Sequence, residues 1–257
     1  MRVFDHFAKE ERPFAERALE MLTLVERKQA MRLTDFVDPR QLLILKSLCS
    51  QVRDVKISAS GGYEGAERVR VIIHPEYMEI EQDDYRLALL AIQADQRFHT
   101  LEHRDVMGAV LSAGMKREKF GDMLTDAGTC YVIAAEEVVD FVCLQVTQIH
   151  RTSVQVERVA WESFTPPAAR LVEKTITVPS PRMDAVIGEV HNMSRAKALV
   201  PIRAGKVKVN WKVTEDPSTQ LAEGDMVSLA GFGRFKIIEV TGTTRSGRLR
   251  MIVGLVT

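Results

Sequence analysis

A segment near the C-terminus, running from Arg182 to Asp225, is the part of this 257-residue chain that most restricts how it can fold. Its first apolar residues recur at helical spacing, Ser194 suits the N-cap of a second short helix, and Gly205 can end that helix with a positive φ. In the following "KVKVN", the valines alternate with Lys206 and Lys208, so the valines should face a small core and the lysines the solvent. The segment therefore predicts two helices followed by a hairpin with one basic face.

Three cations lie at the starts of these two helices, namely Arg182, Arg195 and Lys197. A positive charge gains nothing from the helix dipole there, so this placement indicates that the side chains serve a ligand. A phosphate group would be attracted both by them and by the free N–H groups of the helix start. The alternative is that the arginines form surface salt bridges with Asp184 and Glu189, which contribute little by themselves. We expect Asp184 to orient Arg182 or cap its helix, because a carboxylate repels RNA.

The same residues resemble the S4 RNA-binding domain, whose pattern is R-L-D, then S-R-x-x-A, G-x-V-x-V-N and G-D. The matching positions are Arg182, Asp184, Ser194, Arg195, Gly205, Val207, Val209, Asn210, Gly224 and Asp225. Two positions depart from the pattern. Met183 replaces a usual Leu, which is nearly isosteric, and Pro201 lies inside the second helix, where it should kink or shorten that helix.

The resemblance implies that this segment binds structured RNA, with basic side chains on phosphates and with Ser194 and Asn210 offering local hydrogen bonds. The expected RNA-binding residues are Arg182, Ser194, Arg195, Lys197, Arg203, Lys206, Lys208, Asn210 and Lys212. Secondary contacts are expected from Lys116, Arg117, Lys119, Arg234 and Lys236. For Lys116, Arg117 and Lys119, an equally weighted alternative is a solvated loop, in which Glu118 and Asp122 compensate the positive charge.

The charge distribution supports a nucleic-acid site at this end of the chain. From residue 182 onward there are 12 Lys and Arg against 7 Asp and Glu, a net charge of +5, whereas the first 181 residues carry 23 against 28, or −5. A protein of zero formal net charge therefore has one basic module, which is the electrostatic footprint expected of an RNA-binding domain.

Cysteine usage and hydropathy indicate a cytoplasmic protein that does not associate with membranes. Cys49, Cys130 and Cys143 form no C-x-x-C pair, which argues against a disulfide scaffold or a zinc ribbon and indicates reduced thiols. The first ten residues mix acids and bases, and no apolar run approaches the length of about 18 needed for a membrane span.

Residues 1–80 predict an N-terminal domain of helices followed by strands. Residues 1–50 read as helical: Pro13 suits a first turn, a stripe of Phe14, Ala18, Met21, Leu22 and Val25 follows, and a further helix is expected from Pro39 to Cys49. Residues 52–59 and 68–74 alternate as strands, joined by "SGGYEGAE". No G-K-[ST] follows these glycines, so we favour a flexible hairpin loop over a phosphate-binding loop.

Residues 83–165 predict a central ferredoxin-like domain of βαββαβ order, an arrangement that includes RNA-recognition domains. The expected strands are 85–92, 123–124, 130–134 and 153–159, and the expected helices are 104–114 and 136–146. The overall class is therefore α+β: an N-terminal α+β domain, this central domain and an S4 domain over residues 181–257.

Within the central domain, "LEHRDVMGAVLSAGMKREKFGDML" resembles the central region of the YlmH-like branch of S4 proteins. Together with the S4 pattern, the resemblance covers roughly residues 83–257. It implies a bacterial protein of ribosome-associated quality control, which binds the large ribosomal subunit carrying a stalled peptidyl-tRNA and contacts 23S rRNA and tRNA there.

The connection between the central and S4 domains is rich in proline. In "SFTPPAARLVEKTITVPSP", Pro166 and Pro167 break the chain, "EKTITV" is expected to be a strand, and we place the domain boundary near residue 180. The S4 domain should end in two strands, "MVSLAGFGRFKIIEV" and "RLRMIVG", around "TGTTRSG". The glycines of "AGFGRF" are expected to bend the first of these strands.

Catalytic and metal-binding signatures are weak in this chain. The run from His99 to His103 fits H-x-x-E-H, but the two histidines should span a helix start, which disfavours a zinc site. S4 modules also accompany pseudouridine synthases and tyrosyl-tRNA synthetases, and neither G-R-L-D-x-x-[ST] nor H-I-G-H with K-M-S-K-S occurs here. We expect a non-enzymatic protein without cofactor, metal ion or small-molecule substrate.

Two alternatives stay open. One is an RNA-modifying enzyme, similar to pseudouridine synthases, whose catalytic centre lies unrecognised in the central domain. The other is a protein-interaction scaffold whose helical N-terminus docks a partner, for instance in cell division.

Overall fold

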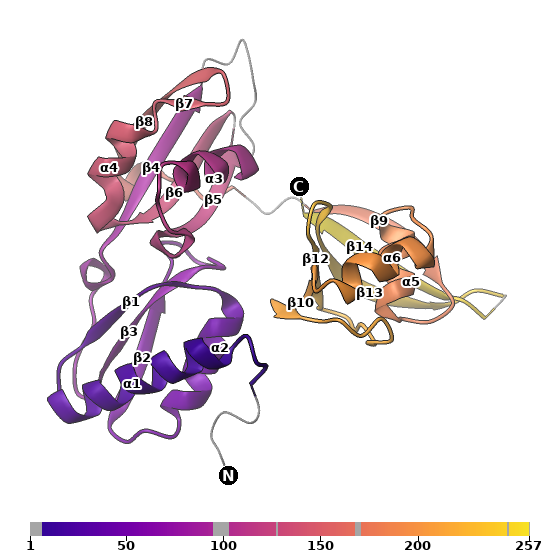
Figure 1. Cartoon of the computed structure of the whole chain (residues 1–257), viewed down its shortest axis with the longest axis horizontal. Helices are drawn as coiled ribbons and strands as arrows, with labels where there is room; N and C mark the ends of the chain where they lie inside the picture. The colour runs from indigo at the N-terminus through magenta and orange to yellow at the C-terminus, as the bar shows by residue number, and fades with distance from the viewer. Residues whose placement is uncertain (1–6, 95–102, 127, 168–170, 246, 257) are drawn as a thin grey trace. The chain divides into compact units, whose positions relative to one another are not determined.

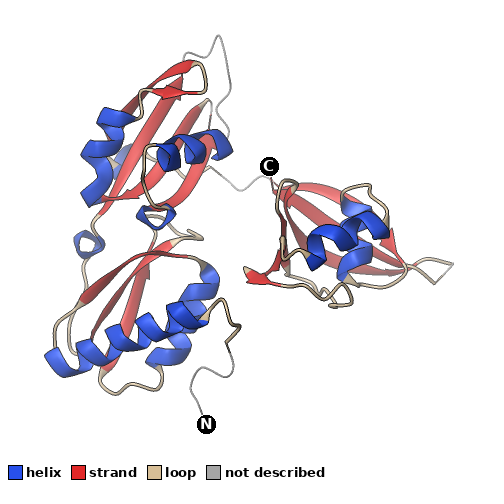
Figure 2. Cartoon of the chain, in the orientation of Figure 1, coloured by secondary structure: helices blue, strands red, loops and turns tan. Residues whose placement is uncertain are grey.

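A computed structural model describes residues 7–94, 103–126, 128–167, 171–245 and 247–256. The chain forms two compact units, Met1–Pro167 and Ala168–Thr257 (Figure 1). Helices and antiparallel sheets occur in both units, so the predicted α+β class is confirmed (Figure 2). No helix in the described ranges is long and apolar enough to cross a membrane.

The first unit begins with two helices packed on a three-stranded sheet of order β1-β3-β2. Its elements are α1 (Arg12–Lys28), β1 (Arg32–Val37), α2 (Pro39–Cys49), β2 (Val55–Ser60) and β3 (Val69–Pro75). The predicted apolar stripe of α1 is present, because Ala18, Leu22 and Val25 are buried against the core. The predicted bounds of α2 are also correct, and Asp38 fixes its start by accepting a hydrogen bond from the backbone N–H of Gln41 at 2.8 Å.

The strand β1 was missed, because residues 1–50 were read as helical. The segment "RLTDFV" pairs antiparallel with β3 and buries Phe36 and Val37. Its β-branched and aromatic residues fit a half-buried strand, and a six-residue strand between two long helical patterns gives only a weak periodic signal.

The second half of this unit is a ferredoxin-like sheet, as predicted. Its elements are β4 (Leu87–Ala94), α3 (His103–Ser112), β5 (Phe120–Asp126), β6 (Thr129–Ala135), α4 (Val139–Gln145), β7 (Gln148–Ile149) and β8 (Thr152–Val159). The strand order is β5-β6-β4-β8-β7 with antiparallel pairs, so β6 lies between β4 and β5, the two strands that α3 connects in sequence. Both helices contribute to one apolar core, to which Val106, Val110 and Val142 belong.

The loop between β2 and β3 packs against this second sheet. Asp122 of β5 accepts hydrogen bonds from the Tyr63 hydroxyl at 2.7 Å, from the backbone N–H of Glu67 at 2.7 Å and from that of Arg68 at 3.1 Å. A Cβ at Gly62 would overlap the indole ring of Trp161. The predicted hairpin is therefore correct, and its loop is anchored to the second sheet, where Gly62 allows close packing.

Aromatic side chains from outside the central sheet cover part of the sheet face that the helices leave uncovered. Phe36 of β1 is fully buried in a cluster with Leu89 and Ile133, which point to this face from β4 and β6. Phe164 packs in the same cluster, with its ring centroid 5.2 Å from that of Tyr131. The two halves of the first unit are thus joined by an apolar cluster as well as by hydrogen bonds.

The second unit is a six-stranded antiparallel sheet with two helices over one face (Figure 1). Its elements are β9 (Leu171–Val178), α5 (Met183–Val190), α6 (Arg195–Arg203), β10 (Val207–Val209), β11 (Lys212–Val213), β12 (Met226–Leu229), β13 (Gly233–Thr243) and β14 (Leu249–Val256). The strand order is β11-β10-β12-β13-β14-β9. Met183, Ile187 and Ile202 of the helices are completely buried against the strands.

The end of this unit differs from the prediction of two strands. The first predicted strand is split into β12 and β13, which pair with each other. Between them, Gly231 and Gly233 have φ values of 84° and 96°, and the N–H of Phe232 donates to the carbonyl of Leu229 at 3.0 Å. The glycines therefore reverse the chain in a tight turn instead of bending one strand.

Candidate nucleic-acid interface

One buried carboxylate holds two arginines at the starts of α5 and α6. Asp184, in the first turn of α5, accepts hydrogen bonds from Arg182 Nε and Nη2 at 3.2 and 3.3 Å and from Arg195 Nη2 at 2.6 Å. The Asp184 side chain is 4% exposed, whereas the arginine side chains are 35% and 53% exposed. The expectation that Asp184 orients Arg182 is confirmed. The alternative, in which the arginines form salt bridges with Asp184, is also observed.

The charge of this cluster is positive. Burial alone would raise the pKa of Asp184, but the hydrogen bonds and positive charges of Arg182 and Arg195 outweigh it, so the pKa is lowered. The carboxylate is therefore ionised at neutral pH and compensates one of the two guanidinium charges. The second charge remains, on side chains that a buried partner holds in place at the surface.

The start of α6 has the predicted cap. The Ser194 Oγ accepts a hydrogen bond from the backbone N–H of Lys197 at 3.2 Å, so Ser194 is the N-cap. Pro201 lies within the helix, which ends two residues later at Arg203, and Gly205 follows with a φ of 66°. Lys197 and Arg203 are exposed.

Asn210 uses both ends of its carboxamide inside the protein. Its Oδ1 accepts from the backbone N–H of Met226 at 3.0 Å, and its Nδ2 donates to Asp225 Oδ1 at 2.8 Å. Asn210 and Trp211 form the two-residue turn between β10 and β11, with φ values of 50° and 65°. Asn210 of the S4 pattern and Asp225, which follows Gly224, therefore hold this turn in place.

Three of the predicted cations lie on the side of the sheet away from the helices, although the sequence predicted one basic face. Val207 and Val209 pack in the core that the helices cover, so Lys208 between them points to the opposite, outer side. Phe235 and Ile237 are completely buried in the same core, which places Arg234 and Lys236 on the outer side as well. The alternation of side chains along each strand therefore separates these cations from Arg182 and Arg195.

The proposed basic loop of the central domain is not a free surface. Lys119 donates to Asp35 at 2.6 Å and to Glu137 at 2.9 Å, and Arg117 Nη1 donates to the carbonyls of Phe120 and Gly121 at 2.5 and 3.2 Å. Burial and the nearby charge of Arg68 lower the pKa of Arg117 to about 10. Lys119 thus links the two halves of the first unit, Arg117 binds backbone carbonyls of β5, and Lys116 is exposed. Their expected RNA contacts stay a prediction.

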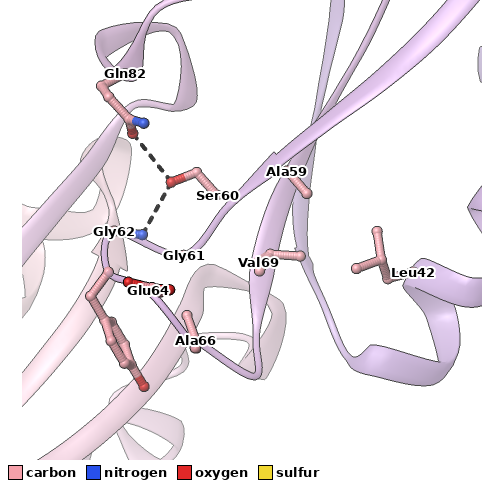
Figure 3. A pocket seen from close by; sticks show the side chains of 11 residues that line it. Leu42, Ala59, Ser60, Gly61, Gly62, Glu64, Ala66, Val69 and Gln82 are labelled. Carbon is pink, nitrogen blue, oxygen red and sulfur yellow. Dashed lines mark hydrogen bonds between the residues drawn. The ribbon is translucent and has the colours of Figure 1, made fainter.

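The glycine-rich loop lines an open cavity of about 470 Å³ (Figure 3). The Ser60 hydroxyl accepts from the N–H of Gly62 at 3.2 Å and donates to the side-chain oxygen of Gln82 at 3.3 Å. Among the described residues that line the cavity, Glu64 is the single charged one. A cavity whose lining residues include a carboxylate and no cation does not favour phosphate, which agrees with the sequence-based preference for a hairpin loop over a phosphate-binding loop.

The described residues contain no group of three or more His, Cys, Asp or Glu side chains that could hold a metal ion. Of the H-x-x-E-H run, His99 and Glu102 lie outside the described residues, and His103 begins α3. The three cysteines are free, and burial raises the pKa of the Cys130 thiol to about 11.

One exposed aromatic residue was not selected from the sequence. Phe232, in the turn between β12 and β13, is 57% exposed, and its ring centroid lies 5.4 Å from that of His191. The signal was the "AGFGRF" segment, which was interpreted only as a bend in a strand.

Two short helices over an antiparallel sheet, the second capped by Ser194, with a carboxylate that displays two arginines, are the arrangement of the S4 class of RNA-binding domain. The S4 domain model matches residues 192–227. The model described as "YlmH, N-terminal" matches residues 10–78, and "Putative RNA-binding domain in YlmH" matches residues 80–163. The chain belongs to the YlmH family.

Two relatives support this assignment. The Ribosome-associated protein quality control protein P2 of Bacillus subtilis (strain 168) is 39% identical over 249 residues, which cover 97% of this chain and 96% of the relative. The solved structure of the cell division protein ylmH from Streptococcus pneumoniae is similar with a TM-score of 0.54 and 29% identity, and the match covers 63% of this chain and 99% of that one.

Proposed function

We propose that this protein binds structured RNA on the large ribosomal subunit, through the side of its S4 unit that carries α5 and α6. The observation that carries the proposal is the pair Arg182 and Arg195, held at the surface by the buried Asp184 beside the N-terminus of α6. Fixed guanidinium groups next to free helix N–H groups suit phosphate oxygens, and contacts of this kind recognise the shape and backbone of folded RNA.

The proposed setting is ribosome-associated quality control, in the cytoplasm, on subunits that carry a stalled peptidyl-tRNA. The name of the Bacillus subtilis relative, which aligns over almost the whole length of both chains, supports this role. The RNA partners would be 23S rRNA and the peptidyl-tRNA. We propose that the protein acts by binding and not by catalysis.

Co-sedimentation with purified large ribosomal subunits, with and without bound peptidyl-tRNA, tests this proposal. We expect the wild type to pellet with the subunits and Arg182→Ala/Arg195→Ala to lose at least about tenfold in affinity, which corresponds to roughly 1.4 kcal/mol. Because this variant leaves Asp184 without its partners, Arg182→Lys/Arg195→Lys keeps the charge and reports on guanidinium geometry alone. The matched control is Arg245→Ala/Arg248→Ala, which removes two exposed cations from the β13–β14 hairpin of the same unit.

Failure of the wild type to pellet under any of these conditions would contradict the ribosomal proposal. The salt dependence gives an independent check on phosphate contacts. With about three to six contacts, the logarithm of the binding constant should fall with the logarithm of salt concentration with a slope of roughly −2 to −5. A flat dependence would show that the basic side chains do not neutralise phosphates.

A scaffold role is the second candidate, because the structural relative from Streptococcus pneumoniae is named a cell division protein. It predicts a protein partner that co-purifies with the full chain after nuclease treatment. Loss of all partners on nuclease treatment would leave the RNA-binding role as the better explanation.

A further inference from the structure

An aromatic ring is exposed at a tight turn of the second unit. Phe232 lies in the turn between β12 and β13, where Leu229 pairs with Gly233, and it is 57% exposed. Gly231 and Gly233 on either side have positive φ values, and the N–H of Phe232 donates to the carbonyl of Leu229 at 3.0 Å. The backbone of the turn is therefore fixed, so a ligand that contacts the ring pays little entropy for ordering it.

Two further aromatic rings support Phe232 from the protein side. His191, the C-cap of α5, has its ring centroid 5.4 Å from that of Phe232 and 5.8 Å from that of Phe235, at interplanar angles of 61° and 67°. Phe235 is completely buried in the core. Burial and the positive charge of Lys174 lower the pKa of His191, so its ring is neutral at pH 7. Phe232 thus packs edge-to-face against the protein while more than half of its surface stays open to solvent.

This ring lies close to the side of the sheet that carries α5 and α6. Arg182 is the N-cap of α5 and His191 is its C-cap, so about 13 Å separates them along the helix axis. The second helix, α6, begins at Arg195, shortly after His191 in the chain. A single RNA segment can therefore reach the two guanidinium groups and the Phe232 ring together.

Positive charges near the turn favour a nucleotide as the ligand of this ring. Lys206 is exposed and lies beside the turn, because its carbonyl accepts from the N–H of Ala230 at 3.1 Å. The Lys174 ammonium group lies at the end of α5, where it donates to the carbonyl of Val190 at 2.8 Å. Residues 182–257 carry 12 Lys and Arg against 7 Asp and Glu, a net charge of +5. An unpaired nucleobase stacks on an aromatic ring while its phosphates are attracted by cations, so one nucleotide matches both properties.

We propose that Phe232 is a stacking platform for one unpaired base of the RNA that the helix side binds. The inference rests on the proposed function for the chemical class of the ligand, and it adds the residue that selects among structured RNAs. Phosphate contacts recognise the backbone of any RNA helix, whereas a base reaches an aromatic ring only at a bulge, a loop or a strand end. Phe232 therefore favours RNA in which a base is out of the helix.

Binding of the full chain to two RNA probes tests the inference. One probe is a 20-base-pair RNA duplex, and the other is the same duplex with one bulged adenosine; fluorescence anisotropy measures both affinities. We expect the wild type to bind the bulged duplex at least about tenfold more tightly, the size of effect that stacking of one base gives. Phe232→Leu keeps an apolar side chain against His191 without an aromatic face, so it should bind both duplexes equally, with the affinity for the plain duplex unchanged. Phe232→Tyr should restore the preference.

The matched control removes an exposed aromatic side chain from the first unit. Tyr77 is 71% exposed, and Tyr77→Leu should keep the preference for the bulged duplex. A bulged 4-thiouridine in place of the adenosine reports direct contact, because irradiation should crosslink it to the peptide that contains Phe232. A crosslink confined to other peptides would overturn the proposal.

The outcomes separate this inference from the proposed function. If the wild type binds both duplexes equally, or if Phe232→Leu keeps the preference, the stacking platform is refuted. The helix-side phosphate site then stands, provided that Arg182→Gln/Arg195→Gln weakens binding to both duplexes. If the wild type binds neither duplex, the platform and the proposed RNA binding are both refuted.

Discussion

Arginines gather around hydrogen-bond acceptors in two regions of this protein, with opposite results. Arg70 lies where the two halves of the first unit meet, a region called the joint below, and is 4% exposed. It donates to the carbonyls of Thr34, Tyr85 and Arg86 and to the carboxylate of Glu137. In the second unit, Arg182 and Arg195 share the single carboxylate of Asp184 and remain 35% and 53% exposed.

The difference lies in the number and position of the acceptors. A guanidinium group has five N–H donors, and four acceptors around Arg70 satisfy it well enough to be buried. One carboxylate shared between two guanidinium groups leaves most of their donors free for another acceptor. The first arrangement stabilises the fold, and the second leaves guanidinium groups exposed at the surface, as the proposed RNA-binding site requires.

The largest effect is expected from Arg70→Ala. The substitution leaves three backbone carbonyls without their donor in a buried joint, so the first unit should lose about 3–5 kcal/mol in free energy of unfolding. Urea denaturation followed by circular dichroism measures this loss. Exposed Arg53 gives the control, and Arg53→Ala should change the unfolding free energy by less than about 0.5 kcal/mol. Equal midpoints for the two variants would show that Arg70 does not hold the joint.

A smaller and pH-dependent effect is expected from Asp184→Asn. The pKa of Asp184 is lowered in the folded state, so its ion pairs stabilise the second unit above the ordinary pKa of an aspartate, near 3.9. That contribution is lost as the pH falls through the lowered pKa. The variant should be about 1–2 kcal/mol less stable at pH 7 and should lack this acid-dependent loss.

Thermal unfolding of the wild type and Asp184→Asn from pH 7 down to pH 2 checks this prediction. The two melting temperatures should converge at the acid end. The control is Glu189→Gln, a change of the same charge at an exposed position of the same unit. A constant difference between wild type and Asp184→Asn at every pH would contradict the ion-pair explanation.

The smallest effect is expected from Lys119→Gln. Its ammonium group bridges Asp35 and Glu137 across the joint, but the side chain is 28% exposed and its partners are 45% and 42% exposed. Salt bridges of this kind contribute about 0.5 kcal/mol, and salt screens them. Urea denaturation at low and high salt should show a difference that shrinks as salt rises. A loss of RNA affinity with unchanged stability would instead support the predicted RNA contact of Lys119.

The sequence by itself determined many local elements of this protein, although β1 was missed and β12 and β13 were taken as one strand. The bounds of α2, the N-cap at Ser194, the βαββαβ order of the central domain and the orienting role of Asp184 were all predicted correctly. These features depend on caps, periodicity and charge pairs within a few residues along the chain, and such signals are present in any short segment.

Only the tertiary structure decided which surfaces are free. Lys119 is paired because β1 brings Asp35 beside it, and Lys208 and Arg195 lie on opposite sides because α5 and α6 cover one face of the sheet. Packing between segments far apart in sequence sets these relations, and no local pattern encodes which face of a sheet another element will cover. The sequence therefore determined which residues are candidates for RNA binding, and the fold decided on which surface each of them lies.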